Sequence, residues 1–396
     1  MNTLLEKCGL EAEAAFAAAE KDAAAFTQTA CDLFGKWDLA SEVSLDTLFE
    51  AAKRTEIADQ GGSQKPGLIE LFRGEHVRMV AHLWSDAADR LHQHDWTGAF
   101  QVIEGQSFNA IYEFVETARI EEFSIGALAR TDLKIFEPGA IQPVIEGGGL
   151  IHSVVYSGKP GMAISLRVAG EGARGAFEYL RPGLRAPSHR RRGNSASQVD
   201  LLAQALQVDE ELYWQRLAEL AGNLSGAGLL RLLDAAAFDG LPLPGDPPDM
   251  IVARLPEAGL ILESLNDIER SDKTRELLSE HSHPELRKVI CAMFHSDNRT
   301  ELQESLRRAG FAEPVRAIGL ALGALLIDAE ESDAPPPDHL IDALGEAALT
   351  GNISEALTAM AVAGKGAPYL QDHAAFVRQA FDSMEEAPFF RCLLKP

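Results

Sequence analysis

The chain has 396 residues, of which 46% are hydrophobic, and its formal net charge at pH 7 is −24. This length allows two or three domains with a sizeable apolar core, whereas the negative charge disfavours binding to nucleic acid or to an anionic membrane. No stretch suits a membrane span, and the N-terminus MNTLLEKCGLEAEAAFAAAEK lacks the basic start and apolar middle of a signal peptide. We therefore expect a cytoplasmic protein with neither nucleic acid nor membrane as a partner.

The first 65 residues are rich in Ala, Glu and Leu, which favour helices. In SEVSLDTLFEAAKR a serine or an aspartate precedes apolar residues at helical spacing, which is typical of a capped helix start. Residues 1–65 are therefore predicted to form an N-terminal helical segment.

From about Leu68 the pattern changes to short β-branched and aromatic runs that are separated by Gly, Pro, Asp or Asn. These runs are HVRMVAHLW, AFQVIEG, FNAIYEFVE, DLKIFEPG, LIHSVVYSG and GMAISLRV. Such spacing is typical of a small antiparallel sandwich or barrel. Residues 66–170 are predicted to form this β domain.

The strand pattern stops after Val168. Residues 171–198 are EGARGAFEYLRPGLRAPSHRRRGNSASQ, and this composition indicates a connection between domains. From residue 199 to 396 the sequence shows helical periodicity interrupted by Gly and Pro, as in VDLLAQALQVDEELYWQRLAELAGNL. The predicted fold class is α+β, with N-terminal helices, an antiparallel β-barrel and a mainly α-helical C-terminal domain.

Two histidines separated by one residue stand immediately before the run AFQVIEG. On a β-strand, His92 and His94 project from the same face, so both imidazoles can reach one metal ion. About sixty residues later, His152 lies in another predicted strand. Three imidazoles from two strands form a set with open coordination positions, which suits Fe(II) and, less selectively, Mn, Ni, Zn or Cu. The sequence therefore predicts a metal site.

These residues resemble the two motifs of the cupin superfamily, whose fold is a double-stranded β-helix barrel. The HQH stretch of His92 and His94, together with Gly105, matches the first motif. The Pro-Gly turn that ends at Gly139, followed by GLIH ending at His152, matches the second. The resemblance covers roughly residues 68 to 170, about a quarter of the chain.

The usual glutamate ligand of cupins is absent, because Gly98 stands at its position. Within the superfamily, three histidines without that carboxylate resemble the thiol dioxygenases of the cysteine dioxygenase group, which use ferrous iron and dioxygen. VAHLWSDAADRLHQHDW and HSVVYSGKPGMAISLRV are also similar to the segments around the histidines of that group. The resemblance implies an iron-dependent dioxygenase.

The chain departs from this group on its last barrel strand, where the family has a Ser-x-His-x-Tyr array. The same register gives Ser165, Arg167 and Ala169 here, so the serine is kept, the histidine becomes arginine and the tyrosine is lost. The cysteine that some family members cross-link to that tyrosine corresponds to Gly98. Cysteine itself is therefore a doubtful substrate, and Ser165 is a candidate for substrate binding.

Strand alternation suggests which other side chains face the metal. If Trp84 faces the cavity, His82 and Arg78 do so too, because alternate residues share a face. The family alignment also places His82 and Trp84 on the pocket wall. His82 is a candidate acid or base, or a hydrogen-bonding partner for a substrate headgroup, with a structural core histidine as the alternative.

Arg167 is a cation expected inside the barrel, where it requires an anionic partner, either a substrate carboxylate or Glu113 or Asp132. Tyr156 stands four residues after His152 and is a candidate catalytic phenol, or else a core tyrosine. Trp96 is expected at the cavity mouth. Arg73 lies near the position of the family's carboxylate-binding arginine.

Together these features predict a non-haem Fe(II) cupin oxygenase that uses dioxygen to oxidise a small anionic molecule, with a thiol or an amino-acid-like compound as the first expectation. The helical half is expected to supply a dimer interface or a surface for a partner protein. One alternative is a metal- or ligand-sensing cupin that signals through its helices. Another is a cupin isomerase or decarboxylase that uses a different divalent metal.

Overall fold

The computed structural model describes residues 4–52, 68–84, 89–120, 123–169, 177–187, 194–224, 258–326, 338–350 and 391–394, together with 228, 230, 232–233, 235, 241–243, 358–359 and 378. The chain forms two compact units. The first comprises Met1–Ser85 and Asp89–Glu269, and the second comprises Asp86–Ala88 and Arg270–Pro396. No helix in the described ranges is both long and apolar enough to cross a membrane.

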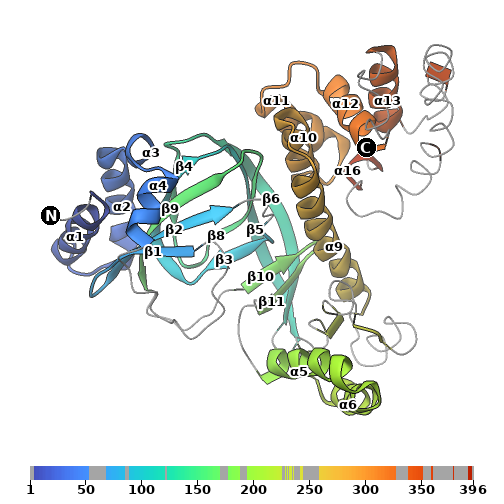
Figure 1. Ribbon diagram of the computed structural model, residues 1–396, viewed down its shortest axis with the longest axis horizontal. Coiled ribbons are helices and arrows are strands. Elements are labelled where there is room, and N and C mark those ends of the chain that lie inside the picture. The colour runs from blue at the N-terminus through green and yellow to red at the C-terminus, as the bar shows by residue number, and fades with distance from the viewer. Residues whose placement is uncertain are drawn as a thin grey trace. The chain divides into compact units, whose positions relative to one another are not determined.

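The first unit contains two groups of antiparallel strands (Figure 1). One group is a five-stranded sheet, which in spatial order consists of β1 (Leu68–Arg73), β2 (Val77–Trp84), β9 (Gly161–Ala169), β4 (Trp96–Glu104) and β7 (Ile141–Val144). The other is a closed barrel, which in spatial order consists of β10 (Phe177–Leu180), β11 (Leu184–Pro187), β6 (Phe123–Phe136), β5 (Ser107–Ile120), β8 (Gly147–Tyr156) and β3 (His92–His94). The predicted fold class is confirmed in its architecture: a closed antiparallel β-barrel, N-terminal helices and a helical C-terminal region.

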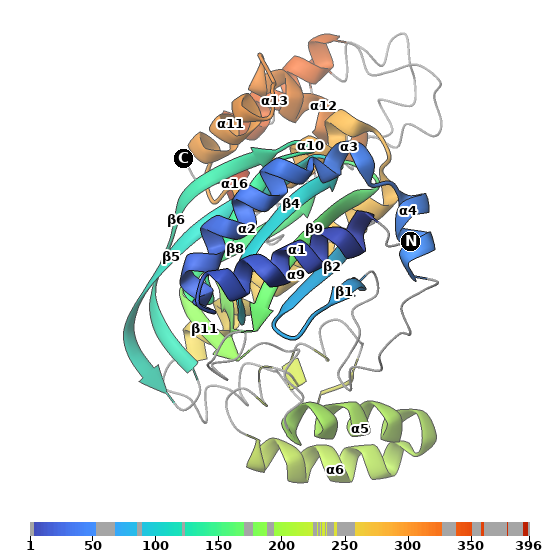
Figure 2. The ribbon, with the colours of Figure 1, turned by 90° about the vertical axis from the view of Figure 1, so that its left-hand side faces the viewer.

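Four N-terminal helices cover the outer face of the five-stranded sheet (Figure 2). They are α1 (Leu4–Ala18), α2 (Ala23–Trp37), α3 (Leu39–Glu42) and α4 (Leu45–Ala52). Asp22 caps α2, because its side chain accepts hydrogen bonds from the backbone N–H groups of Ala24 and Ala25. Apolar helix residues such as Phe16, Phe26 and Phe34 pack against Val77 and other strand residues of the sheet.

The alternation of β2 places one set of side chains against these helices and the other set on the inner face. Val77, Met79 and Ala81 are fully buried in the core that the helices form with the sheet. His82 and Trp84, which belong to the other set, line a cavity on the opposite face. Burial of the outer face therefore sets the register that turns the polar residues inward.

The barrel extends beyond the predicted boundary at residue 170. β10 and β11 lie within residues 171–198, which the sequence analysis assigned to a linker. These strands have four residues each and flank a Pro-containing turn, so they lack the length by which a strand is recognised in sequence. They close the barrel because Glu178 pairs with His92 and Leu184 pairs with Ile125.

The helices that follow the barrel begin with α5 (Asn194–Val208) and α6 (Glu210–Asn223). Asp209 caps α6 through its side chain. The next described helix, α9 (Ala258–Glu280), starts in the first unit, where Ile268 packs against Leu180, Leu184 and other barrel residues. Its last part, from Arg270, belongs to the second unit.

The second unit also contains α10 (Pro284–His295), α11 (Arg299–Arg308), α12 (Pro314–Leu326), α13 (Asp338–Thr350) and α16 (Arg391–Leu394). Two buried arginines stabilise it by donating to main-chain carbonyl groups. Arg270 donates to Met293 and is paired with Asp297 at 3.1 Å, and Arg287 donates to the carbonyl of His281 at 3.2 Å. The helical character predicted for residues after 199 is observed in the described part of this region.

Candidate metal centre

The three predicted histidine ligands lie on neighbouring strands of the closed barrel. His92 and His94 are on β3, and His152 is on β8. His92 stands directly opposite His152 in the antiparallel pair, and a register shift after Gln93 brings His94 opposite Gly147. Gln93 projects to the other side of β3, where it accepts a hydrogen bond of 2.5 Å from the Tyr179 hydroxyl. The alternation that the sequence predicted is thus observed.

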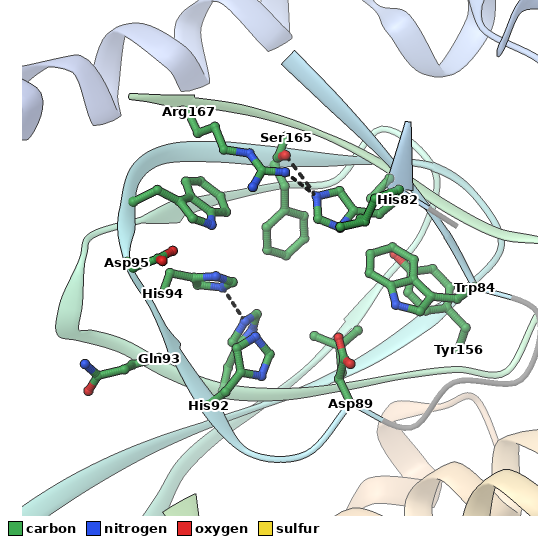
Figure 3. A pocket seen from close by; sticks show the side chains of 16 residues that line it. His82, Trp84, Asp89, His92, Gln93, His94, Asp95, Tyr156, Ser165 and Arg167 are labelled. Atoms are coloured by element: carbon green, nitrogen blue, oxygen red, sulfur yellow. Dashed lines mark hydrogen bonds between the residues drawn. The ribbon is translucent and has the colours of Figure 1, made fainter. Parts of the chain in front are cut away.

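The imidazole nitrogens of these histidines converge. One ring nitrogen from each residue lies within 4.8 Å of the other two, and the Nε2 atoms of His94 and His152 are 2.8 Å apart (Figure 3). Two imidazole nitrogens that bind one ion at ~2.0–2.1 Å and at a right angle are ~3 Å apart. The spacing therefore fits a shared metal ion.

Hydrogen bonds at the far side of two rings leave their metal-facing nitrogens unprotonated. The Nδ1 of His92 donates to the carbonyl oxygen of Arg90 at 2.8 Å, and the Nδ1 of His152 donates to the Oδ1 of Asn109 at 2.8 Å. Both acceptors lack a hydrogen, so the proton is on Nδ1 and the lone pair is on Nε2. Such partners orient histidine ligands and fix their tautomer.

The surroundings also keep the imidazoles neutral. Burial, and then the neighbouring His152 and His92, lower the pKa of His94 well below its ordinary value. Burial and the neighbouring His92 lower the pKa of His152 in the same direction. A metal binds the neutral imidazole, so the site is in its binding form at neutral pH.

No carboxylate belongs to this cluster among the residues that the structure describes. Gly98, the position at which the sequence analysis looked for an acid, has no side chain to supply one. Its φ is +149°, and a Cβ added there would lie 2.0 Å from the carbonyl oxygen of Leu166. The backbone at this position therefore excludes a side chain, and the site is a three-histidine site.

The histidines face a cavity of about 160 Å³ that lies between the two groups of strands. This is roughly ten times the ~10–15 Å³ that one water molecule requires. The closed barrel contributes the histidines, Val154 and Tyr156, and the five-stranded sheet contributes the opposite wall (Figure 3). On that wall lie His82, Trp84, Trp96, Phe100, Ser165 and Arg167.

A hydrogen-bonded group on the opposite wall contains three of the predicted site residues. Arg167 Nη2 donates to His82 Nε2 at 3.2 Å, and the Ser165 hydroxyl lies 2.9 Å from the same nitrogen. A guanidinium only donates, so His82 Nε2 accepts and this imidazole is neutral. The carbonyl oxygen of Val80 lies 3.2 Å from the Ser165 hydroxyl, whose single hydrogen goes to this oxygen or to His82 Nε2. His82 and Ser165 therefore hold the Arg167 guanidinium at the cavity wall.

Arg167 is a cation without a carboxylate partner in the described part of the chain. The Nε atom is buried and makes no hydrogen bond there, and the guanidinium lies over the Trp96 ring at 5.2 Å from its centroid. Burial lowers the pKa of Arg167 to about 10, while Asp95 and Glu70 oppose this effect. The guanidinium thus remains charged at neutral pH. Neither Glu113 nor Asp132, the partners considered from the sequence, forms a salt bridge with it.

The predicted residues Trp84 and Tyr156, which come from the two facing walls of the cavity, stack on one another. Trp84 stacks on His82, with ring centroids 5.1 Å apart, and on Tyr156, with centroids 4.8 Å apart. Figure 3 shows Tyr156 beside Trp84, across the cavity from His94. Burial raises the pKa of the Tyr156 phenol far above its ordinary value, so the hydroxyl stays protonated.

Two predicted arginines are not among the residues that line the cavity. Arg73, at the end of β1, is exposed and forms a salt bridge with Glu70 at 2.6 Å. Arg78 is also exposed and stands directly opposite Arg167 on the neighbouring strand. Its positive charge contributes to the lowered pKa of Arg167. Arg78 and His82 are both on β2, but only His82 lines the cavity, so Arg78 lies beyond its end.

Sequence reasoning missed two residues of this region. Asn109 holds His152 from β5, and its only signal in the sequence is one amide within the apolar run FNAIYEF. Asp89 lines the cavity from the segment before β3. Asp89 lies three residues before the HQH stretch and outside a strand, so strand alternation does not predict the direction of its side chain. Only the tertiary structure shows that direction.

Comparisons with known proteins add little to this geometry. A scan against protein-family models found no match, and a search of the curated proteins found none. Among solved structures, the chain is similar to an uncharacterized conserved protein with a double-stranded beta-helix domain from Klebsiella pneumoniae subsp. pneumoniae. The two are 16% identical, the match covers 29% of this chain and 85% of that chain, and the TM-score is 0.17. These values support no conclusion about the site.

Proposed function

We propose that the protein is a non-haem Fe(II) oxygenase that uses dioxygen to oxidise a small anionic molecule, with a thiol or an amino-acid-like compound as the first candidate. One observation carries the proposal. Three imidazoles converge on one point without a carboxylate among the described residues, and the Arg167 guanidinium faces the same cavity from the opposite wall. The donor set fits a divalent transition metal, with Fe(II) first and Mn, Ni, Zn or Cu as alternatives.

The charge of the centre favours an anionic substrate. His92, His94 and His152 are neutral donors, so they leave the charge of a divalent ion uncompensated. When bound, ferrous iron would supply the activation of dioxygen. A substrate thiolate or carboxylate would compensate the positive charge of the metal ion that the three histidines leave uncompensated.

Arg167 is the residue that we assign to anchoring the substrate anion. Its side chain is half-buried, charged and free of carboxylate partners in the described residues, so a substrate carboxylate is its best available partner. His82 positions the guanidinium by accepting its hydrogen bond, and Ser165 supports the same nitrogen. In this arrangement His82 acts by positioning Arg167. The lone pair of His82 Nε2 accepts the hydrogen bond from Arg167, so it is not available to act as a base.

Aromatic side chains lie against the histidines of the centre. Trp96 lies against His94 with ring centroids 4.8 Å apart, and Phe100 lies 6.1 Å from His152. Trp84 lines the cavity and stacks on His82. Tyr156 retains its proton because burial raises the pKa of the phenol, so we assign it to packing against Trp84.

A metal- or ligand-responsive protein is the second candidate, favoured by one chain of contacts. Gln93, between two of the ligands, accepts from Tyr179 of β10. Two residues further on, Arg181 forms a salt bridge of 2.6 Å with Asp267 of α9, which continues into the second unit. Helical surfaces would then contact a second copy or a partner protein.

An isomerase or decarboxylase would use the same metal site without consuming dioxygen.

The test is metal analysis of anaerobically purified full-length protein, combined with oxygen-uptake measurements on a panel of thiols and amino acids. We expect close to stoichiometric iron and substrate-dependent oxygen consumption. His152→Ala should lose the metal, whereas His283→Ala, an exposed residue without a capping hydrogen bond, should retain it. Stoichiometric zinc with no oxygen uptake on the whole panel would contradict the proposal and favour the sensor.

A further inference from the structure

The strand that carries two of the three histidines is short. β3 comprises only His92–His94, and its antiparallel neighbours are β8 on one side and β10 on the other. Among the described residues, the main chain of β10 meets this segment at few points. Glu178 pairs with His92, and the N–H of Tyr179 donates to the carbonyl oxygen of Leu91 at 2.8 Å. On this side the position of β3 therefore depends on side chains as well as on main-chain hydrogen bonds.

A side-chain hydrogen bond joins the same two strands. The Tyr179 hydroxyl donates to Gln93 Oε1 at 2.5 Å, and both side chains are buried. Gln93 stands between His92 and His94, and Figure 3 shows its amide directed away from the point at which the histidines converge. Because alternate residues of a strand face opposite sides, a side chain held on one side of β3 fixes the direction of the two rings on the other.

The phenol itself is held by two further strands of the barrel. Tyr179 stands directly opposite Arg185 of β11, and its ring meets the ring of Phe114 of β5 edge-on, with centroids 5.2 Å apart. Burial raises the pKa of the Tyr179 phenol to about 12, while Arg185 acts to lower it, so the guanidinium lies near the phenol oxygen. A nearby cation attracts the lone pairs of that oxygen, which turns its only hydrogen toward Gln93.

Tyr179 lies outside the cavity. It is not among the residues that line the cavity, and its hydroxyl is engaged with Gln93. Any effect of this phenol on the histidine site must therefore pass through β3. The sequence analysis assigned β10 to a linker, so this support for the ligand strand comes from outside the predicted barrel.

We propose that Tyr179 is a positioning residue for the metal centre, whose hydrogen bond to Gln93 holds β3 so that the two histidines of this strand reach the same ion as His152. The inference rests on the metal-binding part of the proposed function and uses neither the substrate nor the oxygenase reaction. Asn109 orients one ring, whereas Tyr179 acts on the strand that presents two ligands together.

The test is metal binding by the full-length protein under nitrogen, with Tyr179→Phe as the variant because it removes only the hydroxyl. Competition with a chelator measures the affinity for Zn(II), and the visible absorption spectrum of the Co(II)-loaded protein reports the geometry of the ligands. Tyr179→Phe should bind Zn(II) about 10–100-fold more weakly, and its Co(II) bands should differ from those of the wild type in position or intensity. A wild-type affinity or a wild-type Co(II) spectrum in this variant would overturn the inference.

Tyr213→Phe is the matched control. Tyr213 is also a buried tyrosine, and its hydroxyl donates to the carbonyl oxygen of Pro242 in a different core of the first unit. Removal of this hydroxyl should lower the melting temperature, while the Zn(II) affinity and the Co(II) spectrum stay as in the wild type. If Tyr213→Phe weakens Zn(II) binding as much as Tyr179→Phe does, the effect is general destabilisation and the inference is wrong.

Gln93→Met tests whether the two side chains act through one bond. This change replaces the acceptor by an apolar side chain of similar length, and it should weaken Zn(II) binding about as much as Tyr179→Phe does. The double variant should lose no more affinity than either single variant, because both changes remove the same interaction. Additive losses would mean that the two side chains act separately, which would overturn the assignment.

Failure of this inference and failure of the proposed function are distinguishable. None of these measurements uses dioxygen, so a Co(II) spectrum that depends on Tyr179 would stand even if the iron-loaded protein consumed no oxygen. Conversely, substrate-dependent oxygen uptake by a protein whose metal binding is unaffected by Tyr179→Phe would support the oxygenase and contradict the role of Tyr179.

Discussion

The Nδ1 atom of His152 donates a hydrogen bond of 2.8 Å to the Oδ1 atom of Asn109, which lies on the neighbouring strand β5. Asn109 is fully buried, and the ring of His152 is 2% exposed. This bond directs the lone pair of His152 Nε2 to the point that His92 and His94 share. The amide of β5 therefore sets the orientation of a ligand that stands on β8.

Asn109→Ala should weaken metal binding by ~10–100-fold, because the ring of His152 loses the partner that orients it. The buried Nδ1–H also loses its acceptor, which should cost about 1–3 kcal/mol of unfolding free energy. Competition with a chelator for Zn(II) measures the affinity. Asn109→Asp keeps an acceptor at the same place and should restore binding, whereas equal losses in both variants would indicate a packing role only.

Gly98→Ala should destabilise the barrel by more than about 1 kcal/mol, because its φ of +149° and the Leu166 carbonyl at 2.0 Å leave no place for a Cβ. The midpoint of urea unfolding, followed by tryptophan fluorescence, measures the change. Gly148→Ala is the matched control, since a Cβ there meets nothing within 4 Å. Gly98→Glu should likewise fail to build a fourth metal ligand, and a stable variant with tighter metal binding would refute this.

Arg167→Met should leave the metal content unchanged and weaken the binding of 3-mercaptopropionate to the Zn(II) protein by about tenfold, the effect of one charge-assisted hydrogen-bonded anchor. Calorimetry measures the affinity, and mass spectrometry measures the metal. Arg216→Met serves as the control, because Arg216 is exposed on α6 and pairs with Glu219 at 2.7 Å. An unaltered affinity in Arg167→Met would remove this arginine from the site.

The metal-free protein should lose stability as the pH falls through about 6.5. The folded pKa values of His94 and His152 lie well below the ordinary value of 6.5, mainly because both rings are buried. Between those values and about pH 6.5 the unfolded chain binds more protons than the folded chain, so the free energy of unfolding decreases as the pH decreases.

Thermal melting of the metal-free protein between pH 7.5 and pH 5.5 tests this dependence. The double variant His94→Gln and His152→Gln should show a flatter dependence of melting temperature on pH, whereas His283→Gln, at an exposed position, should melt as the wild type does. Parallel curves for the double variant and the wild type would assign the acid sensitivity to other groups.

Much of the fold could be predicted from local pattern. The six β-rich runs correspond to β2, β4, β5, β6, β8 and β9, and the helix predicted from SEVSLDTLFEAAKR is α4. Alternation within one strand also placed His92 and His94 on one face, because period two is a property of the strand itself. Such signals depend on a few consecutive residues, so they are readable before the chain is folded.

The rest of the site depends on residues that are distant in sequence. Asn109 reaches His152 across 43 positions, and Arg167 reaches His82 across 85. Arg73 is the opposite case, because its partner is close in sequence: it pairs with Glu70, three residues away on the same strand. Strand spacing specifies the face of a residue, and the position of each strand among its neighbours specifies which residues meet.

The sequence by itself determined that one strand directs His92 and His94 to the same face and that position 98 has no side chain, because these are properties of residue identity and strand period. Only the tertiary structure decided that Arg167 faces the histidines without a carboxylate partner in the described residues, and that Asp89 points into the same cavity. The reason is physical: the electrostatics of a cavity depend on the distances between its walls, and those distances arise only when the two groups of strands pack together.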